Sequence, residues 1–292
     1  FTSATSGNVG GAIGLYQLTG SLSGLSAAGN VSGGATAGGV IGYFNVSNVA
    51  LGAGSIIEVL PTTGQRTVSA TTWAGGLVGY ADGTGSITAS TATGSVSGTN
   101  NNTGSVGGLV GEFRMSGGMS DVHAAGTVST GYHVGGLAGY TNTTGTIGGG
   151  SAASTVTSAS VTGGVNVGGV IGYAQGTGTI TNFTTSMAVT GGSVTNPQAV
   201  GGIVVRAVGL VSNSTSSSNV SGNANTNVGG LVGWSEGGGV SNSSASGTVS
   251  QTGTNASVGG LVGYLNGATG ISNSSASGNV SSTSTNTNVG GL

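Results

Sequence analysis

A pair of adjacent glycines recurs ten times along the 292-residue chain, each time within a variant of the motif Val-Gly-Gly-[Leu/Val/Ile]-[Val/Ile]-Gly. Successive pairs are 28 to 37 residues apart. The first glycines of the pairs are Gly10, Gly38, Gly75, Gly107, Gly135, Gly168, Gly201, Gly229, Gly259 and Gly290. Because apolar residues also recur at fixed offsets from each pair, the periodicity indicates a structural repeat and not glycine content alone.

Each repeat contains three short apolar segments, the first of which is the motif itself. The second lies twelve residues after the first glycine, at Leu22, Ile87, Met119, Ile147, Ile180 and Ile271, with Val240 displaced by one residue. The third lies at offset twenty-one, at Val31, Val96, Val128, Val156, Val189 and Val280. A small residue usually stands at offset seventeen, at Ala27, Ala92, Ala124, Ala152 and Ala276. The segments alternate with period two, which is typical of β-strands, and no helix is predicted.

Gly, Asn, Ser and Thr clusters separate these segments and are suited to tight corners. A coil of about thirty residues cannot enclose a core alone, but stacked coils pair each strand with its equivalents above and below. The sequence therefore predicts an all-β parallel β-solenoid of about ten triangular coils, forming one continuous domain over residues 1–292. The longest interval predicts a loop insertion within residues 50–72. In the coil that begins at Gly201, Arg206 replaces the usual aromatic residue, which predicts a weakened corner.

Charge is scarce: 3% of the residues are charged and the formal net charge is −2. Stacked coils place like side chains directly over one another, where like charges repel. No basic patch indicates a nucleic-acid partner. The most apolar run, residues 199–211, is interrupted by Arg206 and is too short to span a bilayer, so no membrane span is predicted. Phe1 is not an initiator methionine and no signal-peptide pattern lies near it, so we expect the chain to be processed or an excerpt.

An aromatic residue recurs five positions after the first glycine. The set is Tyr43, Tyr80, Tyr140, Tyr173, Trp234 and Tyr264. Stacking of the coils would bring these rings into one column. The column could be a ring-lined surface for sugars, or it could be ordinary packing with the polar tips in water; the second interpretation is favoured.

Leucines recur two positions after the first glycine, immediately before the valine or alanine of the strand. The set is Leu77, Leu109, Leu137, Leu231 and Leu261. In a regular strand, adjacent residues point to opposite sides. The leucines would then leave the core and form an apolar stripe for assembly, although the sequence leaves their orientation open.

No arrangement of polar residues indicates catalysis. Asp82 and Glu236 share an offset, but five coils, or about 24 Å, would separate them, too far for a glycosidase pair. The densest polar group lies in and next to the coil of Gly107, at Glu112, Arg114, Asp121, His123 and His133. Its members are scattered over three predicted corners and favour solvated side chains. Since no zinc, nucleotide or calcium motif is present, the prediction is a non-enzyme without metal or cofactor.

The segment Val228-Gly-Gly-Leu231-Val232-Gly233, followed by Val240-Ser-Asn242-Ser-Ser-Ala245-Ser-Gly247-Thr-Val249, resembles the GLUG-motif repeat of bacterial surface proteins. The resemblance extends over essentially the whole chain. It implies a β-helical stalk of a secreted or surface-attached adhesin-like protein, and it transfers no catalytic residue.

The hypothesis from sequence is thus a non-catalytic structural or adhesive rod, outside the cell or on its surface, that associates with itself or with a surface glycan. The alternative is a carbohydrate-binding or carbohydrate-processing β-helix that uses the aromatic column. A third candidate, an ice-binding solenoid, would need a face of Thr-x-Thr repeats. Thr155-Val-Thr157 is not repeated in the sequence from coil to coil, so this candidate ranks last.

Overall fold

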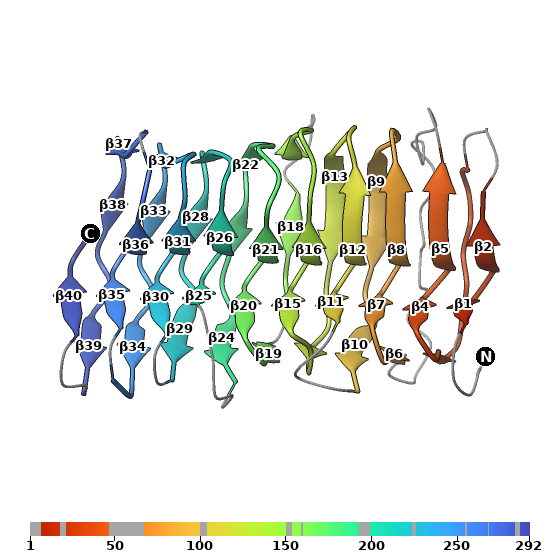
Figure 1. Ribbon diagram of the computed structural model, residues 1–292, viewed down its shortest axis with the longest axis horizontal. Coiled ribbons are helices and arrows are strands. Elements are labelled where there is room, and N and C mark those ends of the chain that lie inside the picture. The colour runs from red at the N-terminus through yellow and green to blue at the C-terminus, as the bar shows by residue number, and fades with distance from the viewer. Residues whose placement is uncertain are drawn as a thin grey trace.

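The computed structural model describes residues 7–17, 22–46, 67–99, 104–149, 154–158, 160–192, 199–223, 226–254, 256–267, 269–283 and 287–292. In these residues every regular element is a β-strand. The strands stand side by side along one long axis, and the chain progresses from one end of the rod to the other (Figure 1). This confirms the predicted all-β parallel solenoid.

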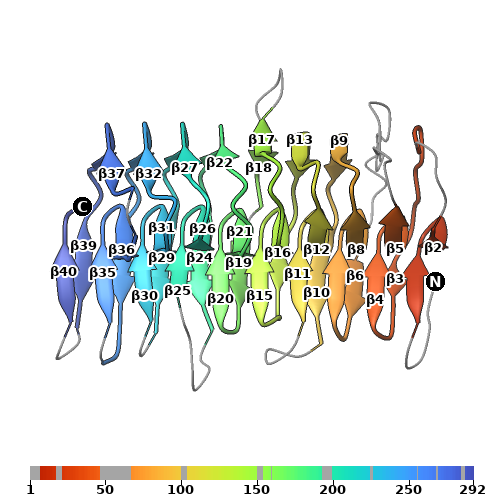
Figure 2. The same cartoon turned by 45° about the horizontal axis from the view of Figure 1, so that its top comes forward.

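Four parallel sheets, numbered I to IV in the order in which each coil meets them, run along the rod (Figure 2). Sheet I contains β1 (Asn8–Gly10), β4 (Thr36–Gly38), β7 (Trp73–Gly75), β11 (Ser105–Gly107), β15 (His133–Gly135), β20 (Asn166–Gly168), β25 (Ala199–Gly201), β30 (Asn227–Gly229), β35 (Ser257–Gly259) and β40 (Asn288–Gly290). Sheet II contains β2 (Ile13–Tyr16), β5 (Ile41–Val46), β8 (Val78–Gly83), β12 (Val110–Met115), β16 (Ala138–Thr141), β21 (Ile171–Ala174), β26 (Val204–Ala207), β31 (Val232–Ser235) and β36 (Val262–Leu265).

Sheet III is built of long strands in two coils and of pairs of short strands in the later coils. It contains β9 (Ile87–Ala92), β13 (Met119–Ala124), β17 (Ile147–Gly149), β18 (Thr155–Val156), β22 (Ile180–Thr181), β23 (Thr184–Thr185), β27 (Val211–Ser212), β28 (Thr215–Ser216), β32 (Val240–Ser241), β33 (Ser244–Ala245), β37 (Ile271–Ser272) and β38 (Ser275–Ala276). Sheet IV contains β3 (Val31–Ser32), β6 (Thr67–Ala70), β10 (Ser95–Gly98), β14 (Val128–Ser129), β19 (Ser160–Gly163), β24 (Ala188–Gly191), β29 (Asn219–Gly222), β34 (Val249–Gln251) and β39 (Val280–Ser282).

The three predicted segments are all present, and the first is divided between sheets I and II. Sheet I has ten strands but sheets II and IV have nine each, because the tenth motif contributes β40 alone. The described residues thus hold somewhat fewer complete coils than the ten predicted. The predicted insertion within 50–72 lies mostly outside the described residues, which resume at β6 in sheet IV.

One predicted alignment is wrong. Val156 pairs with Ala124 in sheet III, and Val161 takes the place in sheet IV next to Val128. The coil that begins at Gly135 is 33 residues long, and its extra residues fall before β18, so counting a fixed offset of twenty-one stops too early. Ala152 lies outside the described residues.

The glycine motif is a steric requirement of the stack. A Cβ atom on Gly136, the second glycine of its pair, would lie 2.2 Å from the carbonyl oxygen of Gly169 in the next coil and 2.5 Å from Val156 Cγ1 across the core. A Cβ on Gly139, the third glycine, would lie 2.4 Å from the backbone nitrogen of Val106 in sheet I. Backbone therefore packs directly on backbone where sheets I and II fold toward each other.

The five leucines of the motif are buried, so the predicted exposed stripe is absent. Each has at most 2% of its surface exposed. The reason is a local irregularity between sheets I and II: the N–H groups of Leu137 and Ala138 both donate to the carbonyl of Val170, at 2.8 and 3.1 Å. The same double donation recurs at Leu109 and Val110. As in a β-bulge, the alternation is broken, and both neighbouring side chains enter the core.

The corner inside sheet III is made by residues with positive φ. Asn182, Asn213, Asn242 and Asn273 have φ between 46° and 61°, a region that Asn tolerates better than most residues. The serine after three of these asparagines points inward. The backbone N–H of Ser214 donates to Ser243 Oγ, and that of Ser243 donates to Ser274 Oγ, both at 3.1 Å. The polar groups of this corner are thus paired up the stack.

Candidate functional site

The six aromatic residues of the predicted column all lie at one position of sheet II. Tyr43 is the register partner of Tyr80, Tyr140 of Tyr173, and Trp234 of Tyr264. Two pairs are stacked: the ring centroids of Tyr43 and Tyr80 are 4.8 Å apart, and the planes of Tyr140 and Tyr173 differ by 5°. In these two pairs the rings cover one another's faces, as in ordinary packing along the rod.

Two charged residues occupy the same column where no aromatic residue stands. Arg206 places its guanidinium 5.0 Å from the ring centroid of Tyr173 and 5.4 Å from that of Trp234, and it forms an ion pair with Glu236. A guanidinium between two ring faces is a favourable cation–π arrangement. The weakened corner predicted for this coil is therefore wrong, because Arg206 continues the column.

Glu112 fills the other gap and is buried, with 5% of its surface exposed. Its carboxylate accepts hydrogen bonds from Trp73 Nε1 at 2.5 Å, from Arg114 Nε at 2.5 Å and from Ser105 Oγ at 3.5 Å. Arg114 in turn lies 5.2 Å from the ring centroid of Tyr140. A buried carboxylate with three donors is a satisfied structural group and not a free base.

Burial also keeps the neighbouring rings uncharged. Burial raises the pKa of Tyr80 to about 12, and it likewise raises the pKa of Tyr140, whose O–H donates to Gln175 Oε1. A phenol with such a pKa stays protonated near neutral pH and does not act as a nucleophile. The chemistry of this surface is therefore hydrogen bonding and ring contact.

The polar residues near Gly107 do not form one site. Glu112 and Arg114 lie in sheet II and His133 lies in sheet I, where it contacts the ring of Tyr173 at 4.8 Å. Asp121 and His123 lie in sheet III, and His123 Nδ1 is 2.7 Å from Thr155 Oγ1. In the described part of the chain, no three His, Cys, Asp or Glu residues gather closely enough to hold a metal ion.

Sequence reasoning missed the sheet I side of this surface. Trp73, Ser105 and His133 occupy successive positions of one column, two residues before the first glycine of each motif. They face the sheet II column: Trp73 contacts both Tyr80, at 4.8 Å between centroids, and Glu112. The recurrence of polar or aromatic residues at this fixed offset was a signal available in the sequence.

His133 should make the stability of the rod depend on pH. Burial lowers its pKa from 6.5 to about 3. Below about pH 6.5 His133 binds a proton in the unfolded chain but not in the folded chain. The free energy of unfolding therefore decreases as the pH falls from about 6.5 to about 3. The substitution His133→Asn, which copies the next residue of the column, Asn166, should reduce this loss. Urea unfolding of both proteins at pH 7 and pH 4 measures the difference; an equal loss in the two would contradict this role of His133.

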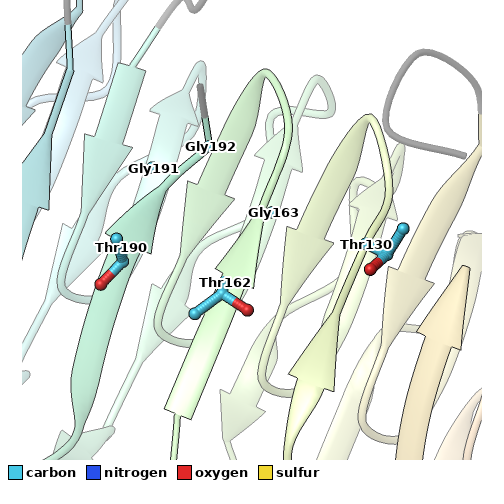
Figure 3. A pocket seen from close by; sticks show the side chains of 6 residues that line it. All are labelled: Thr130, Thr162, Gly163, Thr190, Gly191 and Gly192. Atoms are coloured by element: carbon cyan, nitrogen blue, oxygen red, sulfur yellow. The ribbon is translucent and has the colours of Figure 1, made fainter. Parts of the chain in front are cut away.

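A shallow hollow of about 230 Å³ opens at the edge of sheet IV. It is lined by Thr130, Thr162, Gly163, Thr190, Gly191 and Gly192. The three threonines lie along successive coils, as Figure 3 shows. The hollow is polar and uncharged, and the sequence contains no motif that predicts it.

The described part of the chain contains no helix long and apolar enough to cross a membrane.

Residues 74–97, 224–250 and 254–281 match the family described as the GLUG motif. Three segments of the chain are therefore GLUG motifs. Each match begins within or just before a strand of sheet I and ends in sheet IV, so one GLUG motif corresponds to one coil of the rod. No curated protein and no solved structure matches the chain.

Proposed function

We propose that this GLUG-repeat chain is a non-catalytic structural and adhesive rod that works at the cell surface or outside the cell. The observation that carries the proposal is the parallel stack, in which each of the described sheets continues from coil to coil, with one register shift between β13 and β17 of sheet III. Such a stack makes a stiff spacer, because every coil contacts only its neighbours and all strands are paired along the axis.

The state of the polar groups supports a role without catalysis. Glu112, the most buried carboxylate among the described residues, accepts hydrogen bonds from three donors, and His133 is kept neutral by burial. Among the other described charged residues, Asp82, Arg114 and Arg206 lie in sheet II, Glu236 directly follows β31 of that sheet, and Asp121 lies in sheet III. The other faces of the described rod carry few charges and many hydroxyl groups, which suits repeated weak contacts with a neighbouring rod or with a cell surface.

The carbohydrate alternative has weaker support. A sugar-binding platform needs an open ring face, but the stacked pairs Tyr43–Tyr80 and Tyr140–Tyr173 cover each other. Tyr264, which is exposed, meets Trp234 edge-on. We therefore assign the aromatic column to stiffening of the rod.

The experiment is surface labelling combined with adhesion. Antibodies against the chain should label intact cells of the source organism, and inert cells that display the chain should adhere to one another or to a host surface more than cells with the anchor alone. Cytoplasmic labelling, or no gain in adhesion, would contradict the proposal. Binding on a glycan array that disappears in Tyr264→Ala would favour the carbohydrate alternative.

A further inference from the structure

The outer face of sheet IV carries a hydroxyl group at the same position of every strand. The residue after the buried valine is Ser or Thr in all nine strands, and the register of the sheet places these residues in one column. The column consists of Ser32, Ser69, Ser97, Ser129, Thr162, Thr190, Ser221, Ser250 and Ser281.

A second column lies two residues earlier, on the same face. Its members are Asn30, Thr67, Ser95, Thr127, Ser160, Ala188, Asn219, Thr248 and Asn279. All are exposed or half-buried, whereas the valine between the two columns is buried or nearly so in every coil. Only Ala188 lacks a side-chain hydrogen-bonding group. We call these two columns the hydroxyl array.

The hydroxyl array is regular in two directions. Neighbouring coils are about 4.8 Å apart along the rod, and residues i and i+2 of one strand are about 6.6 Å apart across it. Hydrogen bonds along the columns hold side chains in place: Thr127 Oγ1 donates to Ser95 Oγ at 2.9 Å, and Ser221 Oγ donates to Thr190 Oγ1 at 3.3 Å. The hollow of Figure 3 continues the array at Thr162 and Thr190.

The composition of the array selects its ligand. It contains no charged residue, which disfavours ionic partners, and no aromatic ring on which a sugar could stack. The hydroxyl array presents a regular lattice of small hydrogen-bond donors and acceptors on the rigid backbone of sheet IV. The oxygen atoms of ice also form a lattice, and its shorter repeat is close to the spacing between coils. We propose that the outer face of sheet IV binds ice.

This proposal differs from the ice-binding candidate considered from sequence, because no strand of sheet IV carries Thr-x-Thr. The sequence Thr155-Val-Thr157 lies in and beside β18 of sheet III. The regular pattern lies in sheet IV, where Ser, Thr and Asn share the positions around one valine, so a search for threonine alone does not find it.

The test measures thermal hysteresis and partition into slowly growing ice with the whole chain. Thr162→Tyr and Thr190→Tyr place a bulky ring in the middle of the array and should abolish both activities. Thr144→Tyr, at an exposed threonine in the corner between β16 and β17, is the matched control and should keep them. Thermal unfolding of each variant checks that the rod remains folded.

A gain-of-function variant keeps the test independent of folding defects. Ala188→Thr completes the array with a residue that favours strands, and it should raise thermal hysteresis at equal protein concentration. A wild-type chain without activity on ice, or tyrosine variants that retain it, would overturn the proposal. Retention on crystalline cellulose without partition into ice would also overturn it and would assign the array to a polysaccharide.

Discussion

Gly136→Ala should lower the free energy of unfolding by about 4 kcal/mol or more, because it introduces a backbone clash in the middle of the stack. The added Cβ would lie 2.2 Å from the carbonyl oxygen of Gly169 and 2.5 Å from Val156 Cγ1. The first neighbour is backbone and cannot move without separating two coils. Chemical denaturation followed by circular dichroism measures the loss.

The control for this substitution is built into the repeat. Gly291 is the second glycine of the tenth motif, and a Cβ there would have no atom within 4 Å. Gly291→Ala should therefore leave the unfolding free energy nearly unchanged. Equal effects of the two substitutions would mean that the glycines serve chain flexibility and not the close approach of coils.

Leu137→Ala should cost about 2–5 kcal/mol of unfolding free energy, the range for truncating a fully buried leucine. Leu137 is 0% exposed, whereas Leu265, which is 42% exposed, provides the matched control and should cost little when changed to Ala. Neither change should alter the association state in sedimentation velocity. If Leu137→Ala weakens self-association but leaves the free energy of unfolding unchanged, the prediction of an exposed assembly stripe would be correct instead.

The sequence predicts the repeat, the parallel stack and the aromatic column because each depends only on which residues occupy equivalent positions in neighbouring coils. Once the motifs are aligned, the partner of Tyr43 must be Tyr80, whichever way the strand turns. The position of Val156 could not be predicted by offset, since a corner can absorb extra residues without disturbing the sheets.

The direction of a side chain was harder to predict than its stacking partner. The leucines were placed by alternation, but the double donation to Val170 shows that alternation stops at the fold between sheets I and II. The role of Arg206 was missed for a different reason: a guanidinium can replace a ring in a stack, so a change of residue type is not a break in the column. The hydroxyl array was hidden because Ser, Thr and Asn are interchangeable in it.

The most direct test of the continuous in-register rod is a set of distances between equivalent residues in different coils. The chain contains no cysteine, so spin labels can be attached to introduced cysteine pairs and measured by double electron–electron resonance. Five coil steps separate Ser97 from Ser250, and seven separate Ser69 from Ser281. At one strand spacing per coil, we expect narrow distributions centred near about 24 Å and about 34 Å. Broad distributions, or distances that do not grow in proportion to the number of coils, would contradict the account.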